Sequence, residues 1–139
     1  MSYAIREGSL ASLAQAERRP NEVWQADVFE SPLPVPTEDG VVWPLMAMVV
    51  EPKSRYLLAT LLAEPGETPA QALGDGIVEA MARNGVIPGE IGTTAALAAE
   101  LTALSQAAGV RIAAVRSMPE LKDTRRIMTA HFKKGLPDH

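Results

Sequence analysis

The sequence has no cysteine and only two histidines, His131 and His139. Without thiols, the chain can form neither a disulfide bond nor a zinc or iron–sulfur site held by cysteine. Because His139 is the last residue, a histidine-rich metal site is excluded too. The absence of cysteine agrees with a reducing compartment, and we therefore expect a cytoplasmic location.

Long apolar segments and glycine-rich loops are also missing. The longest apolar run, residues 41–50, is far shorter than the roughly 20 residues of a membrane-spanning helix, and the N-terminus lacks the apolar core of a secretory signal. Gly74 and Gly76 lie within a helical pattern and do not follow a strand, so they form no phosphate-binding loop. No Gly-x-Ser-x-Gly motif occurs, and the shortage of histidine argues against a catalytic triad. We expect no membrane association and none of these enzyme classes.

What is present is the composition of one globular domain. Of the 139 residues, 47% are hydrophobic and 22% are charged, which is enough for a buried core. The net charge of −4 gives no general attraction to nucleic acid. The charge is uneven, because residues 116–134 carry six basic and two acidic side chains, which leaves a net −8 for the rest.

The residue pattern predicts a small helix followed by a single α/β domain. Residues 1–20 are predicted to form an N-terminal helical appendage that begins at Ser9 and ends at Pro20, because the residue before a proline avoids helical angles. Residues 21–139 form the predicted domain. Its predicted strands are 22–30, 45–50, 55–62, 90–93 and 110–115, and its predicted helices are 68–84, 95–108 and one that starts at Pro119.

The connections between these segments decide the topology. Three strands joined by short connections form an antiparallel meander, whereas a strand that follows a crossover helix lies parallel to its neighbour. The proline-rich segment 31–36 cannot hold a regular ladder, since proline lacks the amide donor, and Asp39-Gly40 closes it as a hairpin turn. We therefore predict a mixed five-stranded sheet, three antiparallel strands plus two parallel ones, with helices on its faces.

A single carboxylate in the middle of the first strand is the main candidate for chemistry. Asp27 ends a Trp-Gln-Ala-Asp sequence in this strand. A divalent metal ion needs several oxygen ligands, but the strand expected beside Asp27 ends with Thr93 and Thr94 in place of a second carboxylate. A threonine at this point is expected to cap the following helix instead.

The first three strands resemble the catalytic core of retroviral-type integrases and transposases. The resemblance is carried by the Val-Trp-Gln-Ala-Asp-Val segment 23–28 and the Ala-Met-Val-Val-Glu-Pro-Lys-Ser-Arg segment 47–55. It implies a ribonuclease H-like fold in which Asp27 occupies the position of the first catalytic aspartate. Glu120, with Asp123 as the next choice, is the candidate for the third acidic residue. The chain is also similar to small bacterial proteins of unknown function that share this core in a degenerate form.

The resemblance implies three catalytic acidic residues, and only Asp27 matches one of them. We therefore expect a non-catalytic domain that binds a protein partner or assembles with itself. The candidate contact surface is the proline-rich loop with Pro34 and Pro36 and the nearby Trp43. Exposed aromatic residues beside rigid prolines often mark such contacts. A sheet edge is the other candidate, and no cofactor is expected for this function.

Two other functions stay open. The first is a metal-dependent nuclease or DNA strand-transferase, in which Asp27 with Glu120 or Asp123 binds Mg²⁺ or Mn²⁺. The second is a catalytically inactive nucleic-acid-binding domain, in which basic side chains on and around the last helix contact phosphates. The basic candidates are Arg116, Arg125, Arg126, Lys133 and Lys134.

Overall fold

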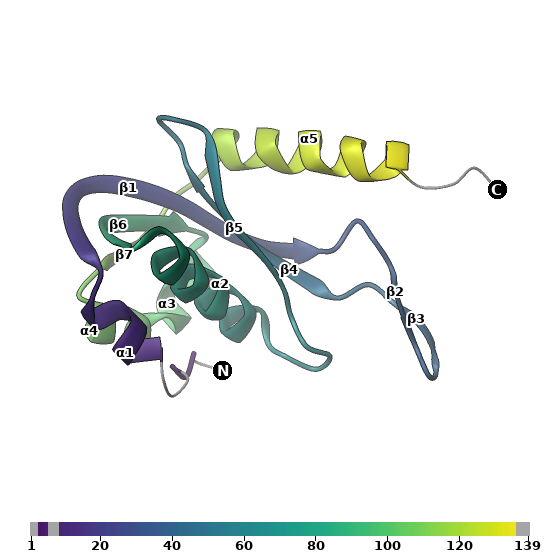
Figure 1. Cartoon of the computed structure of the whole chain (residues 1–139), viewed down its shortest axis with the longest axis horizontal. Coiled ribbons are helices and arrows are strands. Elements are labelled where there is room, and N and C mark those ends of the chain that lie inside the picture. Colours follow the sequence, from purple (N-terminus) through teal and green to yellow (C-terminus); the bar gives the residue numbers. More distant parts are fainter. Residues whose placement is uncertain (1–2, 6–8, 136–139) are drawn as a thin grey trace.

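The structure, a computed structural model, describes residues 3–5 and 9–135, with a five-stranded sheet at its centre (Figure 1). The strands of this sheet are β1 (Glu17–Glu30), β4 (Leu45–Glu51), β5 (Tyr56–Leu62), β6 (Val86–Thr93) and β7 (Arg111–Ala114). They lie in the order β5–β4–β1–β6–β7. The helices are α1 (Ser9–Ala14), α2 (Pro69–Asn84), α3 (Ala95–Glu100), α4 (Thr102–Ala108) and α5 (Pro119–Gly135). None of the described helices is long and apolar enough to span a membrane.

The pairing of the strands confirms the predicted α/β class and mixed sheet. β4 is antiparallel to both β1 and β5, while β6 is parallel to β1 and β7 is parallel to β6. The three strands of the meander, β5, β4 and β1, therefore make up one half of the sheet. β6 and β7, which each follow a crossover helix, make up the other half. The proline-rich excursion closes at Asp39-Gly40 as expected, because β2 (Val35–Thr37) and β3 (Gly40–Val42) form a separate hairpin. The prediction that segment 31–36 holds no regular ladder is wrong at its end, since Val35 and Pro36 pair with Val42 and Val41 at the edge of this two-stranded sheet, where proline is tolerated.

α2 begins and ends where the sequence signals place its ends. The hydroxyl of Thr68 accepts a hydrogen bond from the Gln71 N–H at 3.1 Å, which satisfies one of the free donors of the first turn. Gly85 ends the helix with a φ of 65°, a left-handed conformation that favours glycine. The apolar stripe of α2 is buried and consists of Leu73, Ile77, Ala80 and Met81.

The start of the sheet differs from the prediction. β1 begins at Glu17, so residues 17–20 belong to the sheet and not to the predicted appendage. The Glu-Arg-Arg-Pro sequence is typical of a helix end, but β6 runs directly beside it. A Cβ on Gly89 would collide with the carbonyl of Pro20, so the glycine allows this close approach of the two strands.

The remaining part of the predicted appendage is attached to the body of the domain. α1 packs against α2, and its Leu13 is buried together with Tyr3. Residues 1–2 and 6–8 of the predicted appendage lie outside the described residues. The predicted helix 95–108 is in fact two helices, α3 and α4. They meet at Leu101, whose ψ of 19° departs from the helical value and whose side chain is fully buried.

The two faces of the sheet are covered unequally. α1, α2, α3 and α4 lie on one face, and α5 lies alone along the other (Figure 1). Among the described residues, the α2 side holds a core of 21 buried apolar side chains that includes Trp24, whereas the α5 side holds only six. We call these sets the α2-side core and the α5-side cluster. The α5-side cluster consists of Phe29, Met46, Met48, Val50, Met118 and Leu121.

Candidate functional site

Asp27 lies in the middle of β1 on the face that α5 covers. It pairs across the sheet with Met48 of the α5-side cluster, and it alternates with Ala26, which belongs to the α2-side core. Its Oδ1 accepts a hydrogen bond from the Val28 N–H at 2.8 Å. Burial raises the pKa of Asp27 above its ordinary value, and the Val28 hydrogen bond and the cation of Arg125 oppose this shift only in part.

The charges of Lys122 and Arg125 on α5 act on Asp27, and the acidic candidates of α5 are held by other groups. Glu120 Oε2 accepts a hydrogen bond from Gln25 Nε2 at 3.0 Å, while Gln25 Oε1 accepts one from the Leu121 N–H at 3.3 Å. One side chain on β1 therefore fixes the first turn of α5 over the sheet. The Trp-Gln-Ala-Asp sequence contains this glutamine, but its role was not predicted, because nothing local shows which helix a polar side chain will reach.

Asp123 takes part in surface ion pairs. Its Oδ1 accepts a hydrogen bond from Arg126 at 2.9 Å, and its Oδ2 lies 3.7 Å from Arg55 Nη1. The hydrogen bond and the charge of Arg126 lower the pKa of Asp123, and the more distant Arg55 adds to this effect. The pair with Arg55 links α5 to the turn between β4 and β5.

These contacts do not fit the metal site that the resemblance implies. In residues 3–5 and 9–135, no three Asp, Glu, His or Cys side chains gather closely enough to hold a metal ion. The charges that act on Asp27 come from Lys122 and Arg125, and a cation placed there would be repelled by both. The described part of the chain thus offers Asp27 as one ligand without the further carboxylates that a two-metal site requires.

Thr93 lies on the opposite face of the sheet from Asp27, and not beside it as the sequence analysis expected. Successive side chains of a strand alternate between faces, so Thr93 shares the face of Ile91, which belongs to the α2-side core. Its side chain is fully buried, and its Oγ1 has no hydrogen-bond partner among the described residues. Thr94 takes the expected capping role, because its hydroxyl accepts a hydrogen bond from the Leu97 N–H at 3.4 Å.

Two of the basic candidates, Arg125 and Arg126, contact protein groups of aromatic character or opposite charge. The guanidinium of Arg125 lies 4.0 Å from the centre of the Phe29 ring, and Arg126 pairs with Asp123. Both line a groove of about 540 Å³ along one side of α5, together with Lys122, Thr129 and Ala130. Arg116 is exposed ahead of α5. The side chains of Lys133 and Lys134 lie outside the described part of the chain.

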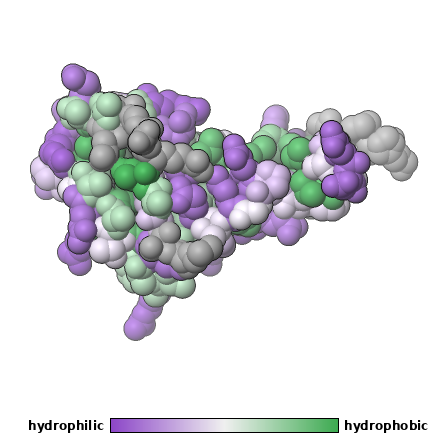
Figure 2. Space-filling view, turned by 90° about the horizontal axis from the view of Figure 1, so that it is seen from below, coloured by the Kyte–Doolittle hydropathy of each residue, from purple (hydrophilic) through white to green (hydrophobic). Residues whose placement is uncertain are grey.

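The hairpin of β2 and β3 carries the predicted partner-binding residues. It projects from the sheet, and Figure 2 shows hydrophobic atoms on the narrow extension where Figure 1 places β2 and β3. Val41 and Val42 are exposed there, and 52% of Trp43 is exposed beside them. Pro34 and Pro36 are exposed as well. The structure thus brings the three predicted residues together on one projecting segment.

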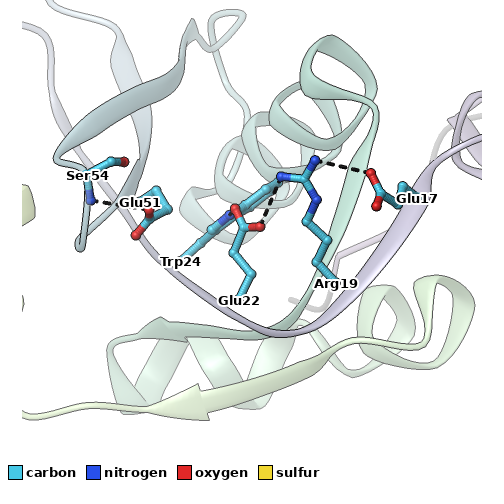
Figure 3. A network of polar contacts seen from close by, with 6 residues as sticks. All are labelled: Glu17, Arg19, Glu22, Trp24, Glu51 and Ser54. Atoms are coloured by element: carbon cyan, nitrogen blue, oxygen red, sulfur yellow. Dashed lines mark hydrogen bonds and ion pairs between the residues drawn. The ribbon is translucent and has the colours of Figure 1, made fainter.

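A cleft of about 790 Å³ lies between the irregular part of β1 and the turn after β4. Figure 3 shows a network of polar side chains in and beside it. The Trp24 Nε1–H donates to Glu22 at 2.9 Å, and Arg19 reaches both Glu22 and Glu17. The carboxylate of Glu51 accepts hydrogen bonds from the backbone N–H groups of the turn. The first set of contacts lies at the irregular part of β1, and the second holds the turn after β4, so both have a structural role.

A second groove, about 400 Å³, lies between the edge strand β5 and α5. Its apolar part consists of Leu57, Ile127 and Met128, and 44% of Leu57 and 61% of Ile127 are exposed. Its polar rim consists of Arg55, Glu120, Asp123, Thr124 and His131. We call it the β5–α5 groove. This groove was not predicted from the sequence, although Ile127, on a different side of α5 from the buried Leu121, was a usable signal.

The comparisons with known proteins give a family without an assigned activity. The model of a family described as Domain of unknown function (DUF6930) matches residues 9–129. These residues include every strand of the sheet and most of α5. A search of curated proteins gives no match to the chain.

Proposed function

The chain belongs to the DUF6930 family of domains of unknown function, and from its geometry we propose that it is a non-catalytic domain that binds a protein partner through the β5–α5 groove. One observation carries this proposal. Leu57 and Ile127 stand on the two sides of a groove and remain exposed, although both belong to elements that bury apolar residues elsewhere. Apolar surface that is exposed to water in the free protein contributes to the binding free energy when a partner covers it.

The arrangement of residues in the groove supports the proposal. Protein interfaces combine an apolar, well-packed centre with a polar rim. In the β5–α5 groove, Leu57, Ile127 and Met128 supply the centre, and Arg55 and His131 belong to the rim. Each Å² of apolar surface that a partner covers contributes roughly 25 cal/mol, so a few exposed side chains can provide much of the affinity.

The strand order supports a relationship with the ribonuclease H-like fold of the integrase core. The order β5–β4–β1–β6–β7 puts the third, second and first strands of the main sheet side by side, followed by two parallel strands, as the resemblance implies. We propose that the active site of this core has degenerated here. Asp27 keeps its place in β1, but burial and the cations of α5 now determine its environment.

Selection of peptides from a displayed random library tests the proposed function. We expect the wild-type protein to enrich a defined set of peptides, and the variant Ile127→Glu to enrich none of them, because an apolar side chain of a peptide could cover the new carboxylate only at the cost of removing it from water. The matched control is Val41→Glu on the exposed hairpin, which should enrich the same peptides as the wild type. Unfolding midpoints of the three proteins should agree, since both positions are exposed. Equal enrichment by the wild type and Ile127→Glu, or no enrichment at all, would overturn the proposal.

A further inference from the structure

We propose that the partner in the β5–α5 groove is a second copy of this chain, whose β2–β3 hairpin crosses α5 and places Trp43 in the groove. Each copy gives its hairpin to the other, so the two copies form a closed dimer with two equal contacts. This inference rests on the proposed function, because it names the partner of the same groove.

The hairpin of β2 and β3 lacks the packing that a two-stranded sheet needs. It forms a sheet of its own, and Pro36, Val42 and Trp43 are exposed on it. An isolated two-stranded hairpin is at best marginally stable in water, and packing against a helix is one way to stabilise it. The hairpin projects away from the main sheet (Figure 1). We therefore expect it to pack against a helix outside its own chain.

α5 and β5 carry an apolar surface that suits such a hairpin. Leu57 and Ile127 stand on the two sides of the β5–α5 groove, and 44% of Leu57 and 61% of Ile127 are exposed. An aromatic side chain buries roughly 150–250 Å², and tryptophan is a common anchor at the centre of protein interfaces. Trp43, of which 52% is exposed, is therefore the side chain that we assign to the groove.

The charge of the hairpin indicates the surface next to that groove. Glu38 and Asp39 lie exposed at the turn between β2 and β3. Residues 31–44 include no lysine or arginine, so no basic side chain of the hairpin segment offsets these two carboxylates. Opposite charges on two surfaces favour their association and fix their orientation. The acidic turn therefore requires a basic surface within its reach.

The far side of α5 supplies a basic surface. Lys122, Arg125 and Arg126 line the groove of about 540 Å³, and helical spacing puts these residues on the side of α5 opposite to the β5–α5 groove. Asp27 acts on Lys122 and Arg125, and Asp123 pairs with Arg126. Two carboxylates against three cations leave a net positive charge on this side of the helix.

The dimensions allow one hairpin to reach both sides of α5. Trp43 follows Asp39 by four residues, a span of about 14 Å in an extended chain, and a helix with its side chains is about 10–12 Å wide. A hairpin across α5 therefore places Trp43 in the groove and its acidic turn over the cations. The second half of α5 and the hairpin lie toward the same end of the molecule (Figure 1), so a two-fold axis at this end can exchange the hairpins of two copies.

Complementation between two variants of the whole chain tests this inference. Trp43→Ser removes the anchor of the hairpin, and Ile127→Glu places a charge in the groove. In sedimentation equilibrium we expect a reversible wild-type dimer and an association at least about tenfold weaker for each variant. An equimolar mixture of the two variants should associate more tightly than either alone, because the mixed dimer keeps one intact contact. A monomeric wild type, or a mixture that associates no better than its components, would overturn the inference.

Two controls accompany this experiment. The matched surface variant Gln106→Ala, on α4, should dimerise like the wild type. The unfolding midpoints of Trp43→Ser and Ile127→Glu should equal that of the wild type at dilutions where all are monomers, since both positions are exposed. Added salt should weaken the wild-type dimer, because it screens the acidic turn from the cations of α5. A dimer that salt leaves unchanged would contradict the proposed orientation of the hairpin.

The library peptides separate this inference from the proposed function. Peptides selected by the wild type should compete with the hairpin and dissociate the wild-type dimer. If the wild type is a monomer and Ile127→Glu abolishes peptide binding, the groove binds proteins but its partner is not a second copy. If Ile127→Glu weakens neither the dimer nor the binding of the peptides, both proposals fail.

Discussion

The two faces of the sheet differ in how completely they are covered. On the α2 side, Trp24, Leu73 and Ile77 are fully buried, and Gly76 lets α2 approach β4 so closely that a Cβ there would collide with Ala47. On the α5 side, one helix rests on a small cluster and is fixed at its start by Gln25. The comparison teaches that a sheet can hold most of its buried apolar side chains on one face, while the other face leaves apolar side chains exposed.

Truncation of one leucine on each face should give the largest effect. We expect Leu73→Ala to lower the free energy of unfolding by about 3–4 kcal/mol, because the close-packed α2 side cannot collapse around the cavity. Leu121→Ala should lower it by about 2 kcal/mol, because α5 can move to fill the space. Denaturant unfolding of both variants measures the difference. Equal losses of unfolding free energy in the two variants would contradict the difference in packing between the two faces.

Removal of the glutamine that fixes α5 should have a moderate effect. Gln25→Ala loses the hydrogen bonds with Glu120 and the Leu121 N–H, and we expect a loss of about 1–2 kcal/mol in unfolding free energy. The first turn of α5 should also exchange its amides faster. Gln106→Ala, at an exposed position of α4, is the matched control and should change neither quantity. A Gln25→Ala variant as stable as this control would show that α5 is held in another way.

The charge of Asp27 should give a smaller, pH-dependent effect. Because burial raises the pKa of Asp27 in the folded state, its ionised form weakens folding above that pKa. This penalty disappears as the pH falls through the raised value toward the ordinary pKa of an unfolded aspartate. Asp27→Asn should therefore be more stable than the wild type at neutral pH and equally stable in acid. Unfolding curves across this pH range measure the difference, and a wild type that is the more stable protein at neutral pH would refute the assignment.

Thr93 should give the smallest effect. Thr93→Val keeps the shape of the side chain and removes a buried hydroxyl without a described partner, so the change should lie between zero and a stabilisation of about 1 kcal/mol. Thermal unfolding measures it. A clear loss of stability would reveal that the hydroxyl has a function on the α2 side.

The sequence was sufficient to predict most of the fold. Strand and helix periods, the Thr68 cap and the Asp39-Gly40 turn are local signals, and they predict the main elements and the mixed sheet of antiparallel and parallel strands that is found. Residues 17–20 were misassigned because their charges and proline look like a helix end, while their strand pairing depends on Gly89 in a distant segment. The break at Leu101 has no local signal either, since neither glycine nor proline lies near it.

The candidate site was less predictable, since it depends on which face each side chain takes. Counting alternate positions from Ile91 would have placed Thr93 away from Asp27. The contacts of Gln25 and the β5–α5 groove depend on where α5 lies across the sheet, and no residue pattern fixes that position. Ile127, an apolar residue on the polar side of its helix, was the one available signal for the groove.

Native-state amide hydrogen exchange tests the contrast between the faces most directly. We expect the slowest amides of α2 to exchange only through unfolding of the whole domain, and those of α5 to exchange faster through detachment of this helix alone. The protection of α5 should rise toward that of α2 when a peptide selected by the wild type is bound. If the amides of α5 are as well protected as those of α2 in the free protein, the claim that the α5 side of the sheet is incompletely covered is wrong.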